Sequence, residues 1–283
     1  MANWPLSPAK IWEAWNETSH AAETAAFIVM VGDATLMDGA DRQIAADGTT
    51  PRRSFMGLDQ LGTADLGPAE ILLVLVQPQD EDRLFPGLRN ADLPLGAVVV
   101  VDDGPAATRD ITWYEPHLLR VSFADDEEGW EVVRKALIDR AEEHLVPLGR
   151  RYPGLRRMAA QKVISRTSKQ NAVIGAAFFV PGTDMPLMTL NQAKMVMGLA
   201  ALYGFELNQD RIVELLGVVG LGFAFRTAAR QVVDFIPGPG LVVKAAIGFS
   251  GTLAMGEAAL KYFEEGAPAT PSRLARVVKR IRK

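Results

Sequence analysis

Three runs of consecutive apolar residues constrain the fold of this chain more than any other feature. They lie at 27–31, 71–76 and 97–101, and a shorter run begins at Leu118. Strands that are apolar at every position, rather than at alternate ones, are typical of a parallel sheet buried on both faces. The first half of the chain is therefore predicted to be a small α/β domain with a mostly parallel sheet. Apolar residues at helical spacing predict a closing helix over about 125–145.

From residue 150 onward the pattern is helical and largely apolar. Helices are expected over about 155–180, 184–204, 208–235 and 241–265. Breaks at Pro181-Gly182 and Pro237-Gly238 predict an apolar bundle of two helix–Pro-Gly–helix hairpins. Surface loops are normally polar, so these apolar turns are expected either to be buried or to enter lipid. The candidate membrane contacts at the turns are Phe178, Phe179, Val180, Phe235 and Ile236.

The two halves of the chain carry opposite charge. Residues 1–150 contain 12 basic and 26 acidic side chains, whereas residues 151–283 contain 18 basic and 8 acidic ones. This asymmetry indicates two domains with different surroundings, and a basic, apolar half suits an anionic membrane surface. Mutual attraction of the two halves is the alternative explanation. The predicted segments are an acidic α/β domain, a basic linker helix, an apolar helical domain and a basic tail, with bounds 1–149, 150–169, 170–266 and 267–283.

The tail combines an apolar stripe with a basic face. Its stripe is formed by Leu274, Val277, Val278 and Ile281, and its basic residues include Arg273, Arg276, Lys279 and Arg280. Such a segment suits an anionic bilayer surface, although a disordered solubilising tail is the alternative. No stretch is long enough to span a bilayer, and the first residues lack the pattern of a signal peptide. We expect a cytoplasmic protein that is peripheral to, or partly inserted in, the inner face of the cell membrane.

Polar residues follow several of the predicted strands. The residues concerned are Gly32, Asp33 and Thr35 after the first strand, Asp59 and Gly62 in a D-x-x-G, Asp102 after the strand at 97–101, and Ser122 in a loop before the closing helix. The first half thus resembles a GTPase domain. The resemblance implies that these positions would contact phosphate, magnesium and guanine.

Departures from the GTPase pattern predict a degenerate site. A phosphate loop of the form G-x-x-x-x-G-K-[ST] needs Lys for the phosphates and a hydroxyl for Mg²⁺. Counting from Gly32, Asp38 stands at the Lys position and Gly39 at the Ser/Thr position, and no N-K-x-D follows. We expect no catalytic residue, cofactor or metal. The alternative is a GTPase with an atypical phosphate loop that binds GTP with Mg²⁺.

The second half resembles a named domain family. The stretches that carry this resemblance are 172–196, with Pro181-Gly-Thr-Asp-Met-Pro186 and Asn191-Gln192, then Leu215-Leu-Gly-Val-Val-Gly220 and Phe235-Ile-Pro-Gly-Pro-Gly240. They are similar to the YcjF-like domain of unknown function. That family occurs in bacterial proteins beside GTPase domains and is regarded as membrane-associated.

The sequence therefore predicts a non-catalytic, membrane-associated scaffold, adaptor or regulator with a pseudo-GTPase domain. Its expected partners are an anionic membrane surface, a protein that binds the acidic domain, and a second copy of the chain. Nucleic-acid binding through the basic tail is a further alternative. It ranks last because the basic residues are not interleaved with an aromatic platform.

Overall fold

The structure is a computed structural model of the chain, and it forms two compact units. One unit is Asn16–Val163, and the other combines Met1–Trp15 with Ile164–Lys283. The residues that the structure describes are 26–44, 52–53, 71–90, 96–115, 118–141, 144–177, 185–205 and 240–266, together with Glu13, Asn16 and Thr18.

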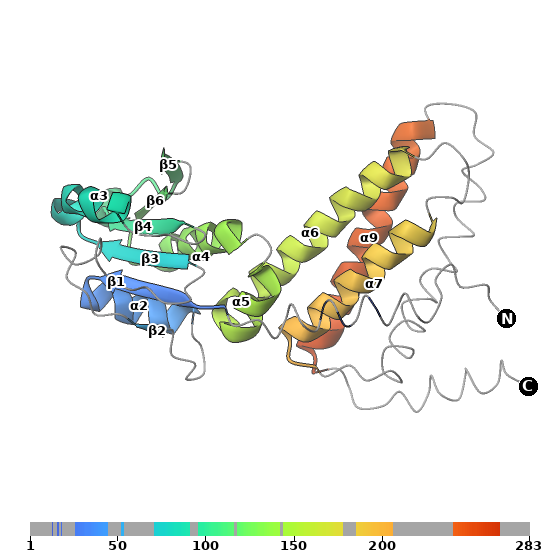
Figure 1. The fold of residues 1–283 in the computed structure, drawn as a ribbon, viewed down its shortest axis with the longest axis horizontal. Helices are drawn as coiled ribbons and strands as arrows, with labels where there is room; N and C mark the ends of the chain where they lie inside the picture. Colours follow the sequence, from blue (N-terminus) through green and yellow to red (C-terminus); the bar gives the residue numbers. More distant parts are fainter. Residues whose placement is uncertain are drawn as a thin grey trace, which may run out of the picture. The chain divides into compact units, whose positions relative to one another are not determined.

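The first unit contains a six-stranded sheet (Figure 1). Its strands are β1 (Ile28–Gly32), β2 (Arg52–Arg53), β3 (Ile71–Val76), β4 (Ala97–Asp102), β5 (Ile111–Glu115) and β6 (Leu118–Phe123). They are ordered β2-β1-β3-β4-β6-β5, and every neighbouring pair is parallel except β5 with β6. Without β5, this is the 2-1-3-4-5 order of one common class of doubly wound sheets. The predicted mostly parallel sheet is confirmed; that it is a degenerate GTPase domain stays a prediction.

Helices cover both faces of the sheet, as the continuous apolar strands predicted. Helix α3 (Glu81–Asn90) contributes Leu84 and Leu88 to a buried cluster with one set of alternating strand residues, which includes Val74 and Val99. Successive strand residues point to opposite faces. On the other face, Trp130 of α4 (Glu127–Ala141) meets Phe123 edge to face at 4.7 Å between ring centroids.

Helix α2 (Ala34–Ile44) packs beside α4 on that second face. A Cβ atom at Gly39 would come within 2.7 Å of the Trp130 ring, so this glycine allows the close contact. The sequence did not predict α2, because its residues lie in the stretch assigned to a phosphate loop. Helix α3 was also missed.

The segment that joins the next two helices is held to the sheet by a buried hydrogen bond. Helix α5 (Leu145–Arg151) leads to the fully buried Tyr152, whose hydroxyl accepts a hydrogen bond from the Ile28 amide at 2.9 Å. Helix α6 (Pro153–Ala177) follows and buries Leu155 in its first turn. The segment predicted as a basic linker helix is thus helical, and the helix continues eight residues beyond the predicted end at 169.

The second unit contains a bundle formed by α6 from Ile164 onward, α7 (Met185–Leu202) and α9 (Gly240–Glu264), and it is called the helical bundle below (Figure 1). Gly256 faces Ile164, and Gly248 faces Asn171, so α9 runs antiparallel to α6. Met188 contacts Gly248, and the Tyr203 hydroxyl donates to Glu264, so α9 runs parallel to α7. The predicted helices at 184–204 and 241–265 are confirmed.

The ends of the bundle differ in their connections. Ala177, Met185 and Gly240 lie at one end, because α7 and α9 begin where α6 finishes. This end is called the apolar end below. The predicted turn residues, the helix expected at 208–235 and the basic tail lie outside the described residues. None of the helices that the structure describes is long and apolar enough to cross a bilayer.

A fully buried hydroxyl joins the three helices of the bundle. The Thr252 Oγ1 atom accepts hydrogen bonds from Asn171 Nδ2 and Gln192 Nε2, each at 2.9 Å, and donates to the Gly248 carbonyl at 2.8 Å. The Asn171 Oδ1 atom in turn accepts from Asn191 Nδ2 at 3.0 Å. A hydroxyl has one donor and two acceptor sites, so Thr252 is fully satisfied.

We predict that Thr252→Val lowers the free energy of unfolding of the protein by about 1–3 kcal/mol. Valine matches threonine in shape but removes the acceptor of two buried amides. Thr252→Ser keeps the hydroxyl and is the control. Urea unfolding followed by circular dichroism measures the difference. Equal stability of wild type and Thr252→Val would contradict the role given to this hydroxyl.

Candidate functional site

The predicted nucleotide site begins where β1 meets α2, and this junction is one residue long. Gly32 ends β1 and Ala34 begins α2, so only Asp33 lies between them. Gly32 has a φ of 125°, and a Cβ atom there would come within 1.9 Å of the Leu75 carbonyl oxygen. Glycine is required here by backbone conformation and by the close approach of β3.

Asp33 occupies the amino end of α2 with its own carboxylate. Its Oδ1 atom accepts hydrogen bonds from the Thr35 amide at 2.9 Å and the Leu36 amide at 3.0 Å. These amides belong to the first turn, where a phosphate would otherwise bind a helix amino terminus. The carboxylate is the N-cap of the helix, and its charge suits the helix dipole. The Thr35 side chain is exposed.

The predicted loop positions beyond Asp33 lie within α2. Met37 is buried, Asp38 is exposed, and Gly39 packs against Trp130. In this conformation, the stretch 34–39 does not form the extended backbone cradle that a phosphate loop provides. Asp59 and Gly62 lie outside the described residues.

A second group of polar residues lies where β4 and β6 end. Asp102 Oδ1 accepts from the Gly104 amide at 3.1 Å, which closes the turn after β4. Ser122 donates to Asp103 Oδ2 at 2.7 Å, and its hydroxyl oxygen accepts from the Thr108 amide at 3.0 Å. Asp102 and Ser122 therefore have local structural partners.

Arg120 of β6 connects this group to α3. Its Nε and Nη2 atoms donate to the two carboxylate oxygens of Glu81, at 2.6 and 3.1 Å. Nη1 and Nη2 also donate to Asp103, each at 3.2 Å. The hydrogen bonds with Glu81 raise the pKa of the Arg120 guanidinium above its ordinary value, and burial opposes this shift. Such a bidentate pair is strongly oriented, so Arg120 is occupied by two carboxylates.

The structure does not bring all the predicted residues together. Asp33 lies after β1, whereas Asp102 and Ser122 lie at β4 and β6, and β3 separates β1 from β4. Parallel strands place all three at the carboxyl edge of the sheet, where doubly wound proteins bind ligands. Among the described residues, no cluster of three or more His, Asp or Glu side chains is placed to hold a metal ion.

Sequence reasoning did not assign Glu81, Arg120 or Arg109 to this edge. Arg109 has a φ of 51° and forms an ion pair with Asp126, whose carboxylate also accepts from the Gly129 amide in the first turn of α4. The hydrogen bond from Arg109 lowers the pKa of Asp126. Arg120 interrupts an apolar strand, and this interruption is the signal that could have identified it.

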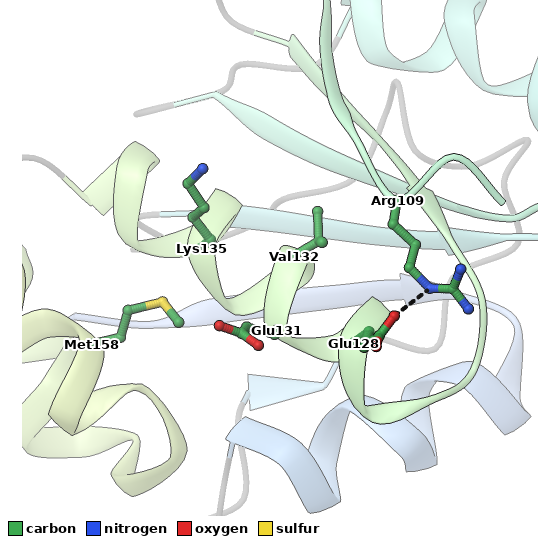
Figure 2. A pocket seen from close by; sticks show the side chains of 6 residues that line it. All are labelled: Arg109, Glu128, Glu131, Val132, Lys135 and Met158. Atoms are coloured by element: carbon green, nitrogen blue, oxygen red, sulfur yellow. Dashed lines mark ion pairs between the residues drawn. The ribbon is translucent and has the colours of Figure 1, made fainter.

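A shallow pocket of about 320 Å³ lies beside α4 (Figure 2). It is lined by Arg109, Glu128, Glu131, Val132, Lys135 and Met158. The lining holds two basic and two acidic side chains, and Arg109 Nε lies 3.8 Å from Glu128 Oε2. Charges of both signs are balanced within the lining, so the pocket has no net charge to select a ligand of one sign.

Comparison with known protein families finds a match in the second half of the chain. Residues 147–283 match DUF697, described as a domain of unknown function. A DUF697 domain is therefore present from within α5 onward, and this is the domain associated with YcjF-like GTPases. The resemblance predicted for the C-terminal half is confirmed, whereas the GTPase-like part stays a prediction. No curated protein and no solved structure matches the chain.

We predict that Arg120→Gln lowers the free energy of unfolding by about 1–3 kcal/mol. The substitution leaves Glu81 and Asp103 without their shared cation. The side chains of both acids are mostly buried, with 18% of Glu81 and 26% of Asp103 exposed. Removing one partner of a fully buried pair costs more, about 3–5 kcal/mol, and residual solvent reduces that cost here.

Arg83→Gln is the matched control for Arg120→Gln. Arg83, in the first turn of α3, forms an exposed pair with Asp80, which directly precedes this helix, and its side chain is 57% exposed. Its loss should change the stability by roughly 0.5 kcal/mol or less. Chemical denaturation compares the two variants, and equal effects would contradict the bridging role of Arg120.

Proposed function

We propose that this protein is a non-catalytic, membrane-associated scaffold or adaptor. In this proposal the DUF697 region binds an anionic membrane surface at the cytoplasmic side, and the acidic α/β unit recruits a protein partner. The proposal needs two supports: a surface suited to lipid and a sheet edge unsuited to nucleotide. Each rests on different described residues.

The exposed apolar side chains of the bundle carry the membrane part of the proposal. Val173, Leu187 and Val242 are 68%, 42% and 69% exposed. They belong to α6, α7 and α9, and each lies within the last or first turn or so of its helix at the apolar end. Single exposed apolar residues are ordinary, and the presence of three of them near one end of the bundle supports contact with lipid.

The predicted turn residues adjoin this end of the bundle in the sequence. Phe178 follows Ala177 directly, and Ile236 precedes Gly240 by four residues. Their predicted contact with lipid is part of this proposal.

The charges at the sheet edge support a non-catalytic α/β unit that binds protein. Asp33 holds the amides of the α2 amino end, and Arg120 is shared by two carboxylates. Exposed acids remain along α3 and α4, including Asp82, Glu127 and Glu131. Such a surface repels a nucleoside triphosphate and attracts a basic protein segment.

We predict that the purified protein does not bind GTP or ATP, with or without Mg²⁺, up to millimolar concentration. The physical reason is the carboxylate of Asp33 at the amino end of α2. Isothermal titration calorimetry measures the binding. Micromolar, Mg²⁺-dependent heat would contradict the proposal and support the alternative of a GTPase with an atypical phosphate loop.

We predict that a fluorescent probe at the apolar end enters lipid. The chain has no cysteine, so Val173→Cys can be labelled at one site with an environment-sensitive dye. Its emission should shift to shorter wavelength with anionic vesicles, because the dye leaves water. Ala258→Cys, exposed on the far half of α9, is the control and should not shift. Unchanged emission at both sites, together with no flotation of the protein, would overturn the membrane part of the proposal.

A further inference from the structure

The charged residues of the helical bundle are ordered along its length. No acidic residue occurs in α6 or α7, and the acids of α9, Glu257 and Glu264, lie in its second half. At the apolar end, residues 170–177, 185–189 and 240–249 contain one charged residue, Lys244. Along the bundle from this end, the side chains are first apolar, then basic, and then of both charges.

The basic residues nearest the apolar end on α6 share an exposed stripe with Val173. Arg166, Lys169 and Val173 are spaced three and four residues apart, and all three are exposed. This spacing places them on one side of the helix. Among the residues that the structure describes, none forms an ion pair with Arg166 or Lys169.

The distances of Arg166 and Lys169 from Ala177 along α6 are close to half the thickness of the hydrocarbon core of a bilayer. Helical rise places Lys169 about 12 Å and Arg166 about 16 Å from Ala177 along the axis of α6. Half of the hydrocarbon core is about 15 Å thick, and the headgroups begin there. If Ala177 is near the bilayer midplane, then Val173 lies among acyl chains while both cations reach headgroup depth.

We infer that the helical bundle enters a single leaflet with its apolar end and that Arg166 and Lys169 bind the phosphates of anionic phospholipids. This inference rests on the proposed function and adds to it a depth, an orientation and the two side chains that bind the lipid phosphates. The absence of acids from α6 and α7 removes the repulsion that an anionic surface would otherwise meet. Attachment therefore depends on charge as well as on apolar area.

The test measures vesicle binding of the full chain by flotation. The vesicles contain phosphatidylcholine alone or phosphatidylcholine mixed with phosphatidylglycerol. The double variant Arg166→Gln/Lys169→Gln should lose about 30-fold in partitioning to the mixed vesicles, since each cation near an anionic surface is worth about a factor of five. Both side chains are exposed, so the melting temperature should not change.

Arg157→Gln/Lys261→Gln is the matched control. It removes the same number of exposed charges from positions farther from the apolar end. The inference is supported if the wild type prefers the mixed vesicles and only Arg166→Gln/Lys169→Gln loses that preference. An equal loss in the control would overturn it, because net charge alone would then explain the preference.

Two further outcomes separate this inference from the proposed function. Equal binding to both vesicle types, unaffected by either double variant, would overturn the anionic-lipid inference and leave membrane attachment intact. No binding to either vesicle type would overturn the proposed function itself. The labelled Val173→Cys protein reports depth in the same samples, and an unshifted dye on bound protein would overturn insertion of the apolar end.

Discussion

Both faces of the sheet must be covered, because β3 and β4 have almost no side chain that tolerates water. Much of the α/β unit follows from this constraint. Helix α2 begins one residue after β1 and packs over the sheet beside α4, while α3 covers the other face. The short β1–α2 junction leaves no room for a loop, and Asp33 satisfies the amides that a loop-bound phosphate would have used. The packing of the sheet and the N-cap that Asp33 forms on α2 are therefore parts of one arrangement.

An element could be predicted from the sequence where its own residues carry a clear apolar pattern. The strands at 71–76 and 97–102 could be predicted because every residue is apolar up to the final Asp102, and tertiary structure only had to supply two covering layers. β5 was missed because it is an edge strand whose Trp113 is 61% exposed, so its sequence lacks that pattern. β2 is two arginines and owes its strand geometry to pairing with Val29 and Met30.

The site was harder to predict than the fold because its contacts join distant segments. Spacing placed Asp102 just after a strand and Ser122 in a loop, whereas Asp102 is the last residue of β4 and Ser122 is the penultimate residue of β6. Glu81 and Arg120 are 39 residues apart, and only the neighbouring positions of β3, β4 and β6 bring them together. An arginine in an apolar strand indicates a buried cation that needs a carboxylate, but it does not identify which carboxylate. Likewise, no pattern in the sequence showed that Asn171 and Gln192 would meet at Thr252.

Binding of the bundle to an anionic surface would explain the opposite charges of the two halves together. The same field that attracts Arg166 and Lys169 repels the exposed carboxylates of α3 and α4. Attraction acts on the DUF697 region and repulsion on the α/β unit, so an acidic sheet edge is kept from adsorbing to lipid. A basic partner therefore does not compete with the bilayer for that edge. Within the proposed function, the acidic residues thus serve twice, because they exclude nucleotide and keep a protein-binding surface accessible at the membrane.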